Sequence, residues 1–361
     1  LGRRNDVYCA SIEHKLGIKA SPTAVLLFGD GKGEVGPGAI GHLVGEENRG
    51  LEYMFVMMNA ARFGVGMQGV AIADRAYQKA VAYARERLQS RAVEGSPGPV
   101  PIIEHPDVRR MLMLMRARTE AARAVAYVAA GWADVAHHHP DAGRRRQAKA
   151  VYEYLVPIVK GWSTEMSIDV ASLGVQVHGG MGYIEETGAA QFYRDARILT
   201  IYEGTTAIQA NDFVGRKTAR DGGAVARSLI GQIRQTAAEL SASTDADLAA
   251  IGRRLAVAAD AHEEVVDYVV SRIKDDIRGV FAGSVPYLEL AGIVHGGWQL
   301  ARAAAVSVRA LRQGSDDRAF HTAKVVTARF FADHVLAAAA GLRDSVVDGS
   351  TGVLGLSAEQ F

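Results

Sequence analysis

Cysteine is almost absent from this chain of 361 residues, in which Cys9 is the only one. A single thiol cannot form an internal disulfide, so nothing here points to a disulfide-stabilised secreted scaffold. An excess of charge is also lacking, because 41 Lys and Arg residues stand against 40 Asp and Glu residues. A formal net charge of +1 argues against the strong basic bias of a protein built to bind nucleic acid.

Long apolar runs are missing as well. No stretch of about 18 consecutive apolar residues occurs, so we expect no membrane-spanning helix. The polar residues 1–6 include Arg3 and Arg4 but precede no apolar run, which argues against a signal peptide. The chain is therefore expected to be cytoplasmic.

The residues that are present indicate a folded protein, because 48% are hydrophobic and 22% are charged. The length suggests two or three domains. Two β-prone runs, 24–28 and 39–44, lie within the first 50 residues on either side of a Gly-rich loop. This pattern predicts two antiparallel strands. An isolated hairpin is only marginally stable, so the two strands are expected to belong to a larger sheet.

From residue 50 onward the pattern is helical. Apolar residues recur at spacings of three and four, as in amphipathic helices. A Gly pair at Gly222-Gly223 marks a candidate boundary between a first and a second helical domain. The predicted fold class is mainly α, with an up-down four-helix bundle at 51–218 and a second helical domain at 219–361. The expected helices are 51–91, 106–137, 144–177 and 205–217, followed by 224–242, 245–277, 284–313 and 316–346.

A Gly-rich segment, Gln176-Val177-His178-Gly179-Gly180-Met181-Gly182-Tyr183, follows the third expected helix. A helix C-cap accounts for one or two of its three glycines. Three glycines also allow close approach of another chain or a ligand to the backbone. No Gly-Lys-Ser/Thr follows and no strand precedes the segment, which excludes a Walker loop and a dinucleotide-binding fingerprint.

Two further motifs carry charged residues among apolar ones. Glu203 follows an apolar run and precedes Gly204-Thr205, which suits a partly desolvated general base. The alternative is a solvated carboxylate at the start of the next helix, and spacing alone favours that reading. Arg62 interrupts an apolar helix face. It must pair with an acid or an anionic ligand if it points inward, or else extend its head group to the rim.

Together these segments resemble the C-terminal half of the acyl-CoA dehydrogenases. The resemblance rests on the Gly-rich segment, on Arg194-Asp195-Ala196-Arg197 and on Ile201-Tyr202-Glu203-Gly204-Thr205. Residues 14–23 are similar to the end of that family's middle β-domain, and Gly45–Gly50 to its loop into the helical domain. The region to Phe361 is similar to the extra helical domain of the branch that includes methylthiopropanoyl-CoA and some fatty-acyl-CoA dehydrogenases.

The resemblance implies FAD-dependent oxidation of an acyl-CoA thioester to the trans-2-enoyl-CoA. Glu203 would take the α-proton, FAD N5 would accept the hydride, and the Glu203 backbone N–H would bond the thioester carbonyl. An electron-transfer flavoprotein is the implied electron acceptor, and a homodimer or homotetramer the implied assembly. Two alternatives stay open: an acyl-CoA oxidase and a non-catalytic helical scaffold.

The resemblance also assigns roles to individual residues. The His137-His138-His139 run is followed by Pro140 and lacks matching carboxylates, so its residues themselves favour a loop over a metal site. His178 is interpreted as a helix-end histidine. The cofactor contacts are expected from Arg91, Gln176, Gly179, Gly180 and Thr205, and the substrate contacts from Asn59, Arg62, Tyr202 and Gly204.

Against the family pattern the chain is expected to be a fragment. It would begin within the middle β-domain (residues 1–50) and lack the N-terminal helical domain. A fragment of this kind is expected to bind flavin poorly by itself.

Overall fold

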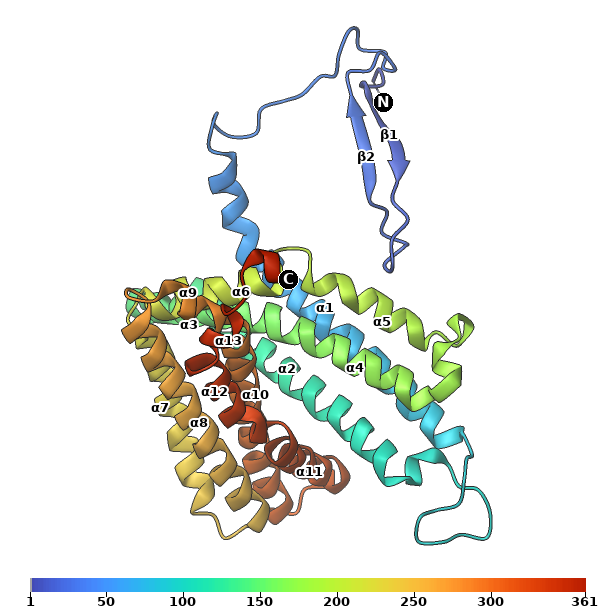
Figure 1. Ribbon diagram of the computed structural model, residues 1–361, viewed down its shortest axis with the longest axis vertical. Helices are drawn as coiled ribbons and strands as arrows, with labels where there is room; N and C mark the ends of the chain where they lie inside the picture. The colour runs from blue at the N-terminus through green and yellow to red at the C-terminus, as the bar shows by residue number, and fades with distance from the viewer. Residues whose placement is uncertain (1) are drawn as a thin grey trace. The chain divides into compact units, whose positions relative to one another are not determined.

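The computed structural model describes residues 2–361 and divides the chain into two compact units, residues 1–60 and 61–361. In the first unit, β1 (Val7–Ile12) pairs with β2 (Ala24–Phe28) in an antiparallel two-stranded sheet (Figure 1). Val7 lies opposite Phe28, and a bulge falls between Cys9 and Ser11. The buried Asp6 carboxylate accepts hydrogen bonds from the backbone N–H groups of Gly31 (2.6 Å) and Lys32 (3.1 Å). These bonds fix the turn that follows β2.

The prediction of a strand at 39–44 is wrong. Those residues have no regular secondary structure, and the partner of β2 is the earlier segment β1. Gly36 and Gly38 have left-handed φ angles of 103° and 81° and flank Pro37, which has no backbone N–H. A Gly-Pro-Gly turn therefore separates β2 from residues 39–44, and no strand among the described residues pairs with that segment.

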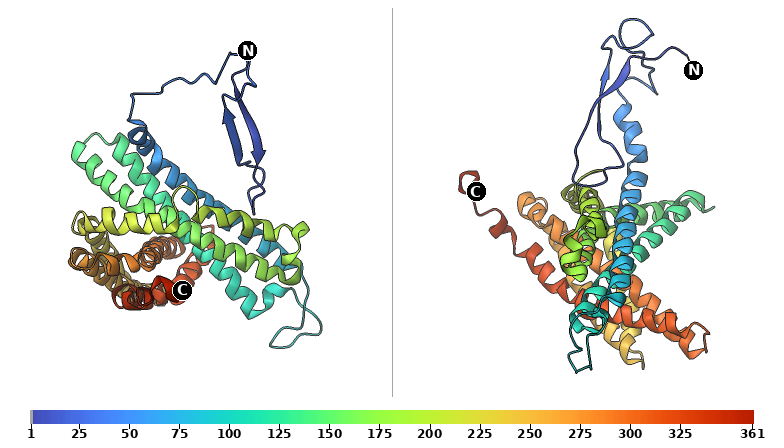
Figure 2. Two further views of the ribbon diagram at one scale, coloured as in Figure 1. Left: turned by 45° about the horizontal axis from the view of Figure 1, so that its top comes forward. Right: turned by 90° about the vertical axis from the view of Figure 1, so that its right-hand side faces the viewer.

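Helices make up nearly all of the rest of the chain (Figures 1 and 2). The helices up to residue 212 are α1 (Gly50–Glu86), α2 (Pro106–His138), α3 (Ala142–Pro157), α4 (Ser163–His178), α5 (Ala189–Arg197) and α6 (Thr206–Asp212). The later ones are α7 (Ala224–Ser241), α8 (Ala246–Arg272), α9 (Ile277–Ala282), α10 (Ser284–Arg312), α11 (Arg318–His334), α12 (Ala339–Val347) and α13 (Ser350–Val353).

The mainly helical fold class is confirmed, with local differences from the predicted helices. The helix expected at 144–177 is two helices joined by a π turn, η2 (Ile158–Trp162), which follows Pro157. Proline lacks the N–H of a regular helical bond, so the helix can continue only with an altered turn. Helix α5 was not predicted. It starts after Gly188, which has a left-handed φ of 77°. The Gly-rich sequence before it gives no clear signal of a helix start.

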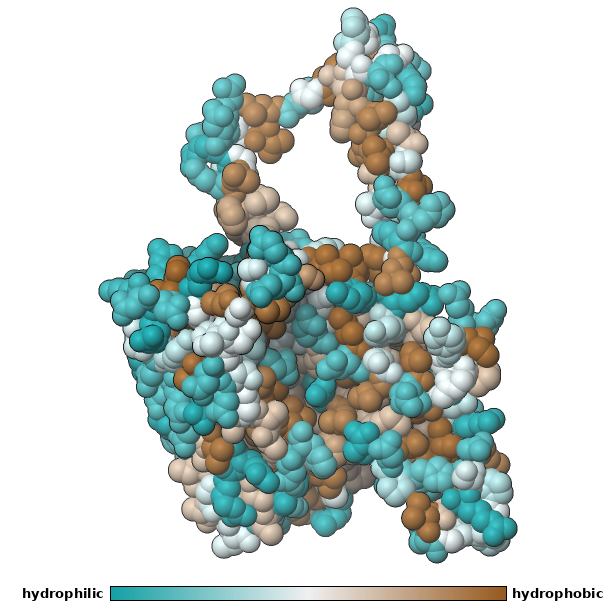
Figure 3. All heavy atoms as spheres, viewed as in Figure 1, coloured by the Kyte–Doolittle hydropathy of each residue, from teal (hydrophilic) through white to brown (hydrophobic). Residues whose placement is uncertain are grey.

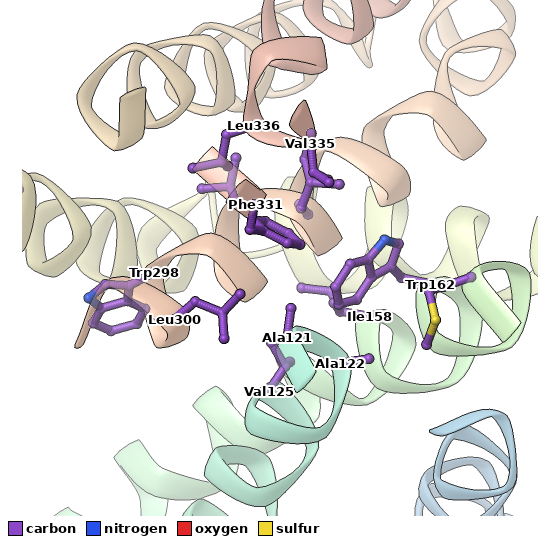
Figure 4. Close-up of a cluster of buried hydrophobic side chains, with 14 of the residues drawn as sticks. Ala121, Ala122, Val125, Ile158, Trp162, Trp298, Leu300, Phe331, Val335 and Leu336 are labelled. Atoms are coloured by element: carbon purple, nitrogen blue, oxygen red, sulfur yellow. The ribbon is translucent and has the colours of Figure 1, made fainter. Parts of the chain in front are cut away.

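Helices from both predicted helical domains share one hydrophobic core (Figure 4). Trp162 and Ile158 of η2 and Ala121 of α2 lie in the same hydrophobic cluster as side chains of α10 and α11. Gly292 of α10 packs so closely that a Cβ there would lie 2.2 Å from the Trp162 ring. The second compact unit therefore spans the predicted boundary at 218. The boundaries at 50 and 218 stay predictions.

Two histidines are buried where α8 and α10 meet the bundle. His262 and His295 are 0% and 1% exposed, and His262 Nε2 lies 3.4 Å from the Tyr154 hydroxyl. Burial lowers the pKa of His295 to about 4, and burial together with His295 lowers the pKa of His262 well below its usual value. Both rings are therefore neutral in the folded protein at neutral pH.

These histidines predict loss of stability in mild acid. The unfolded chain binds protons at both rings below about pH 6.5, whereas the folded chain does not, so stability falls as pH falls from about 6.5 toward about 4. The free energy of unfolding is expected to drop by about 2 kcal/mol per histidine between about pH 7 and about 5. Denaturant unfolding across this pH range measures the drop in unfolding free energy. The drop should be smaller in His295→Phe and unchanged in the control His42→Ala, which removes an exposed histidine. A flat profile in the unsubstituted protein contradicts it.

One helical stretch of the described residues, Arg318–Val347, is long and apolar enough to pass as a membrane span. It comprises α11 and α12, and 44% of its most apolar window is buried inside the protein. Val325, Phe331 and Val346 contribute to the core, as expected of a packed helix pair. The absence of a membrane span stays a prediction. On the face drawn in Figure 3, apolar residues are scattered among polar ones.

Candidate active site

Glu203 lies on a tight turn between the single-turn helix η5 (Ile198–Thr200) and α6. Its φ is 55°, and Gly204 follows with a φ of 86°, so two successive residues are left-handed. Glu203 is half-buried, and its Oε1 atom is buried without a hydrogen-bond partner among the described residues. A buried carboxylate oxygen that bonds to none of the residues described can accept a proton from a ligand. Glu203 therefore has the partly desolvated carboxylate that the general-base interpretation needs, and that role stays a prediction.

The other residues of the motif fix the turn. The Tyr202 hydroxyl donates to Gln68 of α1, and the Thr205 side chain caps α6 by accepting from the Ile208 N–H at 3.3 Å. The left-handed φ of Gly204 favours glycine, and a Cβ there would lie 2.7 Å from the side-chain Nε2 of Gln209. Tyr202, Gly204 and Thr205 thus have evident structural roles, and their expected contacts with ligands stay predictions.

Lys160, which sequence reasoning missed, contacts the backbone of this turn from the protein core. It belongs to η2 and is fully buried. Its Nζ donates to the carbonyl oxygens of Leu199 at 2.9 Å and Gly204 at 2.6 Å. Burial lowers the pKa of Lys160 to about 8, an effect that the nearby carboxylates of Glu165 and Glu203 partly oppose. The sequence does carry a signal for it, because Lys160 is the one charged residue in the apolar run 155–162.

Arg62 points inward, and its partner is an acid of this chain. Its Nη1 lies 3.1 Å from Asp212 Oδ2, and the two side chains are 10% and 6% exposed. The rim position is therefore wrong, and pairing with an acid is confirmed. Helix α1 approaches η2 closely enough that a Cβ on Gly66 would lie 2.4 Å from the Val159 carbonyl oxygen. The second expected substrate residue on α1, Asn59, is half-buried and falls in the first compact unit.

A second site surrounds the Gly-rich segment at the end of α4. A groove of about 400 Å³ is lined by Gln176, Gly179 and Gly180, which the sequence analysis had grouped, and by Tyr83 and Arg87 from the other side. Arg91 does not line it. Helix α1 ends at Glu86, and Leu88 then pairs with Pro101, so Arg91 lies in the exposed loop beyond. The helix expected to reach residue 91 therefore ends earlier, and Arg87, which the sequence analysis did not single out, belongs to the groove. The cofactor contact expected from Arg91 stays a prediction.

His178 closes the base of this groove. It is the last residue of α4, and its Nδ1 lies 2.7 Å from the Gly174 carbonyl oxygen. Its ring stacks on Tyr83 with centroids 4.4 Å apart. Burial lowers its pKa, so the neutral ring is favoured. The interpretation of His178 as a helix-end residue is confirmed.

The three glycines of the segment differ in what the chain itself demands. Gly179 has a left-handed φ of 60°. A Cβ on Gly182 would lie 2.3 Å from the Val175 carbonyl oxygen, whereas a Cβ on Gly180 would meet nothing within 4 Å. Internal packing therefore accounts for a glycine at position 182 but not at position 180. Gly180 presents uncovered backbone to the groove.

This difference predicts opposite outcomes for two alanine substitutions. Gly182→Ala should lower the free energy of unfolding by about 1–3 kcal/mol because the methyl group overlaps backbone atoms. Gly180→Ala should leave it unchanged. Denaturant unfolding of the two variants measures this, and an equal loss in both contradicts it.

Comparison with known proteins places the chain in a family. The acyl-CoA dehydrogenase C-terminal domain matches residues 48–217, and the acetyl-CoA dehydrogenase C-terminal-like domain matches residues 229–357. The chain belongs to the acyl-CoA dehydrogenase family, whose C-terminal helical region it carries. Among curated proteins, it is 51% identical over 98% of its length to the 3-methylmercaptopropionyl-CoA dehydrogenase of Ruegeria pomeroyi. It is 35% identical over 93% of its length to the broad-specificity linear acyl-CoA dehydrogenase FadE5 of Mycobacterium tuberculosis.

The chain spans 58% and 56% of the lengths of these two relatives. Two solved structures share its fold at low sequence identity. The Bacillus anthracis acyl-CoA dehydrogenase complexed with FAD matches 99% of this chain and 58% of its own, with a TM-score of 0.71 and 21% identity. Caenorhabditis elegans ACDH-11 in complex with C11-CoA matches 92% and 51%, with a TM-score of 0.72 and 19% identity.

Proposed function

We propose that the whole protein catalyses FAD-dependent α,β-dehydrogenation of an acyl-CoA thioester to the trans-2-enoyl-CoA. The observation that carries the proposal is the Glu203 carboxylate, which has a buried, unpartnered oxygen on a constrained turn. Membership of the family and the two dehydrogenases with 51% and 35% identity support the reaction class. The particular acyl group is left open.

The residues of the second groove fit a flavin nucleotide in their chemistry. Gly180 leaves backbone uncovered, Gln176 offers an amide, and Arg87 offers a guanidinium suited to a phosphate. We infer that these residues, together with Gly179, hold part of bound FAD. When bound, FAD supplies the hydride acceptor, and that chemistry belongs to the cofactor.

The chain's own contribution to the reaction is proton transfer and orientation. Glu203 takes the α-proton of the substrate at its free carboxylate oxygen. The backbone N–H of Glu203 donates to the thioester carbonyl and stabilises the charge that develops there. The half-buried position of Glu203 keeps bulk water from competing for the carboxylate.

The assembly and electron acceptor follow from the same proposal. We infer a homodimer or homotetramer in the cytoplasm that passes electrons to an electron-transfer flavoprotein. An acyl-CoA oxidase is the alternative, and oxygen consumption during turnover distinguishes the two.

Anaerobic mixing of the flavin-loaded whole protein with a series of acyl-CoA thioesters tests the proposed reaction. Bleaching of the oxidised flavin, with formation of the 2-enoyl-CoA, is expected for at least one member of the series. Flavin that stays oxidised with short, long and thioether-containing acyl-CoAs contradicts the proposal.

A further inference from the structure

The turn that carries Glu203 has a backbone conformation that must be held in place. Glu203 and Gly204 are both left-handed, with φ angles of 55° and 86°. Glutamate, unlike glycine, is strained in this region. Strained conformations persist where the surrounding structure fixes them. The contacts to this turn therefore identify the residues on which the position of the Glu203 carboxylate depends.

Lys160 makes two charged contacts to the backbone of this turn. Its Nζ donates to Leu199 O at 2.9 Å and to Gly204 O at 2.6 Å, so one ammonium group joins the two sides of the turn. Gln209 adds weaker bonds from its Nε2 to the carbonyl oxygens of Glu203 (3.3 Å) and Gly204 (3.4 Å). Bonds from a charged donor are stronger than bonds from a neutral amide. Of the two side chains that bond to the backbone carbonyls of the turn, Lys160 is thus the stronger contact.

The location of Lys160 supports a functional role. Burying an ammonium group is costly unless its hydrogen bonds are satisfied. The residue lies in the π turn η2, and π turns inside helices are frequent at functional sites. Its fully buried side chain reaches the turn from the side of the core. It is therefore placed to act on Glu203 without touching a substrate.

We propose that Lys160 is the positioning residue of the candidate base, holding the left-handed turn that presents the Glu203 carboxylate to the substrate. This inference rests on the proposed function, because it gives Lys160 a part in the reaction of Glu203. No residue of the sequence motifs supplies this contact.

The charge of Lys160 is sensitive to its surroundings. Burial lowers its pKa to about 8, Glu165 of α4 and Glu203 raise it, and Arg62 of α1 lowers it. Arg62 is itself paired with Asp212 of α6, and Glu165 accepts a bond from the Thr206 hydroxyl. The ammonium form predominates at neutral pH and is lost as pH rises through about 8. Both bonds to the turn then lose their charge assistance.

The first test compares Lys160→Met with Lys149→Met in the whole protein, since Lys149 is an exposed lysine on the neighbouring α3. Lys160→Met is expected to lower kcat about 10²-fold, because misplacing a reacting group by about 1 Å has effects of that size. KM for acyl-CoA and flavin content should stay unchanged. Amide hydrogen exchange at 203–206 should rise in Lys160→Met and not in Lys149→Met.

The second test uses pH and needs no loss-of-contact variant. In the unsubstituted protein kcat should fall as pH rises from about 7 to about 9, following the lysine ammonium. Lys160→Arg keeps its charge over this range, so its kcat, relative to its own value at neutral pH, should stay level. An unsubstituted protein whose kcat does not fall over this range overturns the proposal, even if Lys160→Met does not fold.

The exchange measurement separates this proposal from the proposed function. Unchanged exchange at 203–206 in Lys160→Met shows that Lys160 does not hold the turn and overturns the inference. Increased exchange with unchanged kcat overturns the positioning role. The proposed function fails by a different result, namely flavin that stays oxidised in the unsubstituted protein with every acyl-CoA of the series.

Discussion

Glu203→Gln is expected to slow flavin reduction by acyl-CoA about 10²–10⁴-fold, the usual contribution of a positioned general base. Glutamine has nearly the same shape, so the turn, the bonds from Lys160 and Gln209 to its backbone, and flavin binding should persist. The amide cannot take the α-proton. Anaerobic stopped-flow measurement of flavin bleaching in the whole protein gives the rate.

Glu186→Gln is the matched control for this substitution. Glu186 is an exposed glutamate in the short 3₁₀ helix η4 (Glu185–Thr187) before α5, where the same change removes one charge and no buried group. Its bleaching rate should equal that of the unsubstituted protein. Comparable rates in Glu203→Gln and Glu186→Gln would remove Glu203 from the chemistry.

Asp212→Ala is expected to destabilise the protein by about 3–5 kcal/mol, because it leaves a buried arginine without its counter-charge. Arg62 and Asp212 are 10% and 6% exposed and lie 3.1 Å apart. Water cannot readily replace the lost carboxylate at such a site. Denaturant unfolding at neutral pH measures the change.

The double variant Arg62→Met/Asp212→Leu tests whether the loss comes from the unpaired charge. Replacing both members of a buried pair by apolar residues is often neutral or stabilising. The double variant should therefore recover most of the stability lost in Asp212→Ala. A loss below about 1 kcal/mol in Asp212→Ala would mean that the guanidinium reaches water.

The sequence predicted those features of the fold and site that depend on local patterns. Helix α2 was expected at 106–137 and spans 106–138, because its apolar periodicity and flanking breakers are local signals. Glu203 and Gly204, and likewise Gln176 and Gly180, are neighbours in the sequence. Their proximity in the structure follows from their motifs.

Features that depend on distant pairing could not be predicted. Arg62 meets Asp212 across 150 residues, and Lys160 meets Leu199 across 39. A single sequence carries no signal that pairs such positions. The partner of β2 was missed for a similar reason, because β1 (VYCASI) shows no clear alternation of apolar and polar residues. The end of α1 at Glu86 was missed in the same way, because it is followed by a pairing of Leu88 with the more distant Pro101.

The tight fit of Gly292 against Trp162 has a consequence for protein engineering. Trp162 is the last residue of the π turn that contains Lys160, and its ring is covered by α10. Removing the residues after about 218 would remove α10 and expose the Trp162 ring in η2, next to Lys160. A minimal version would need a new apolar lid over Trp162. Conversely, a larger residue at 292 is expected to displace the Trp162 ring and, two residues along the backbone, Lys160.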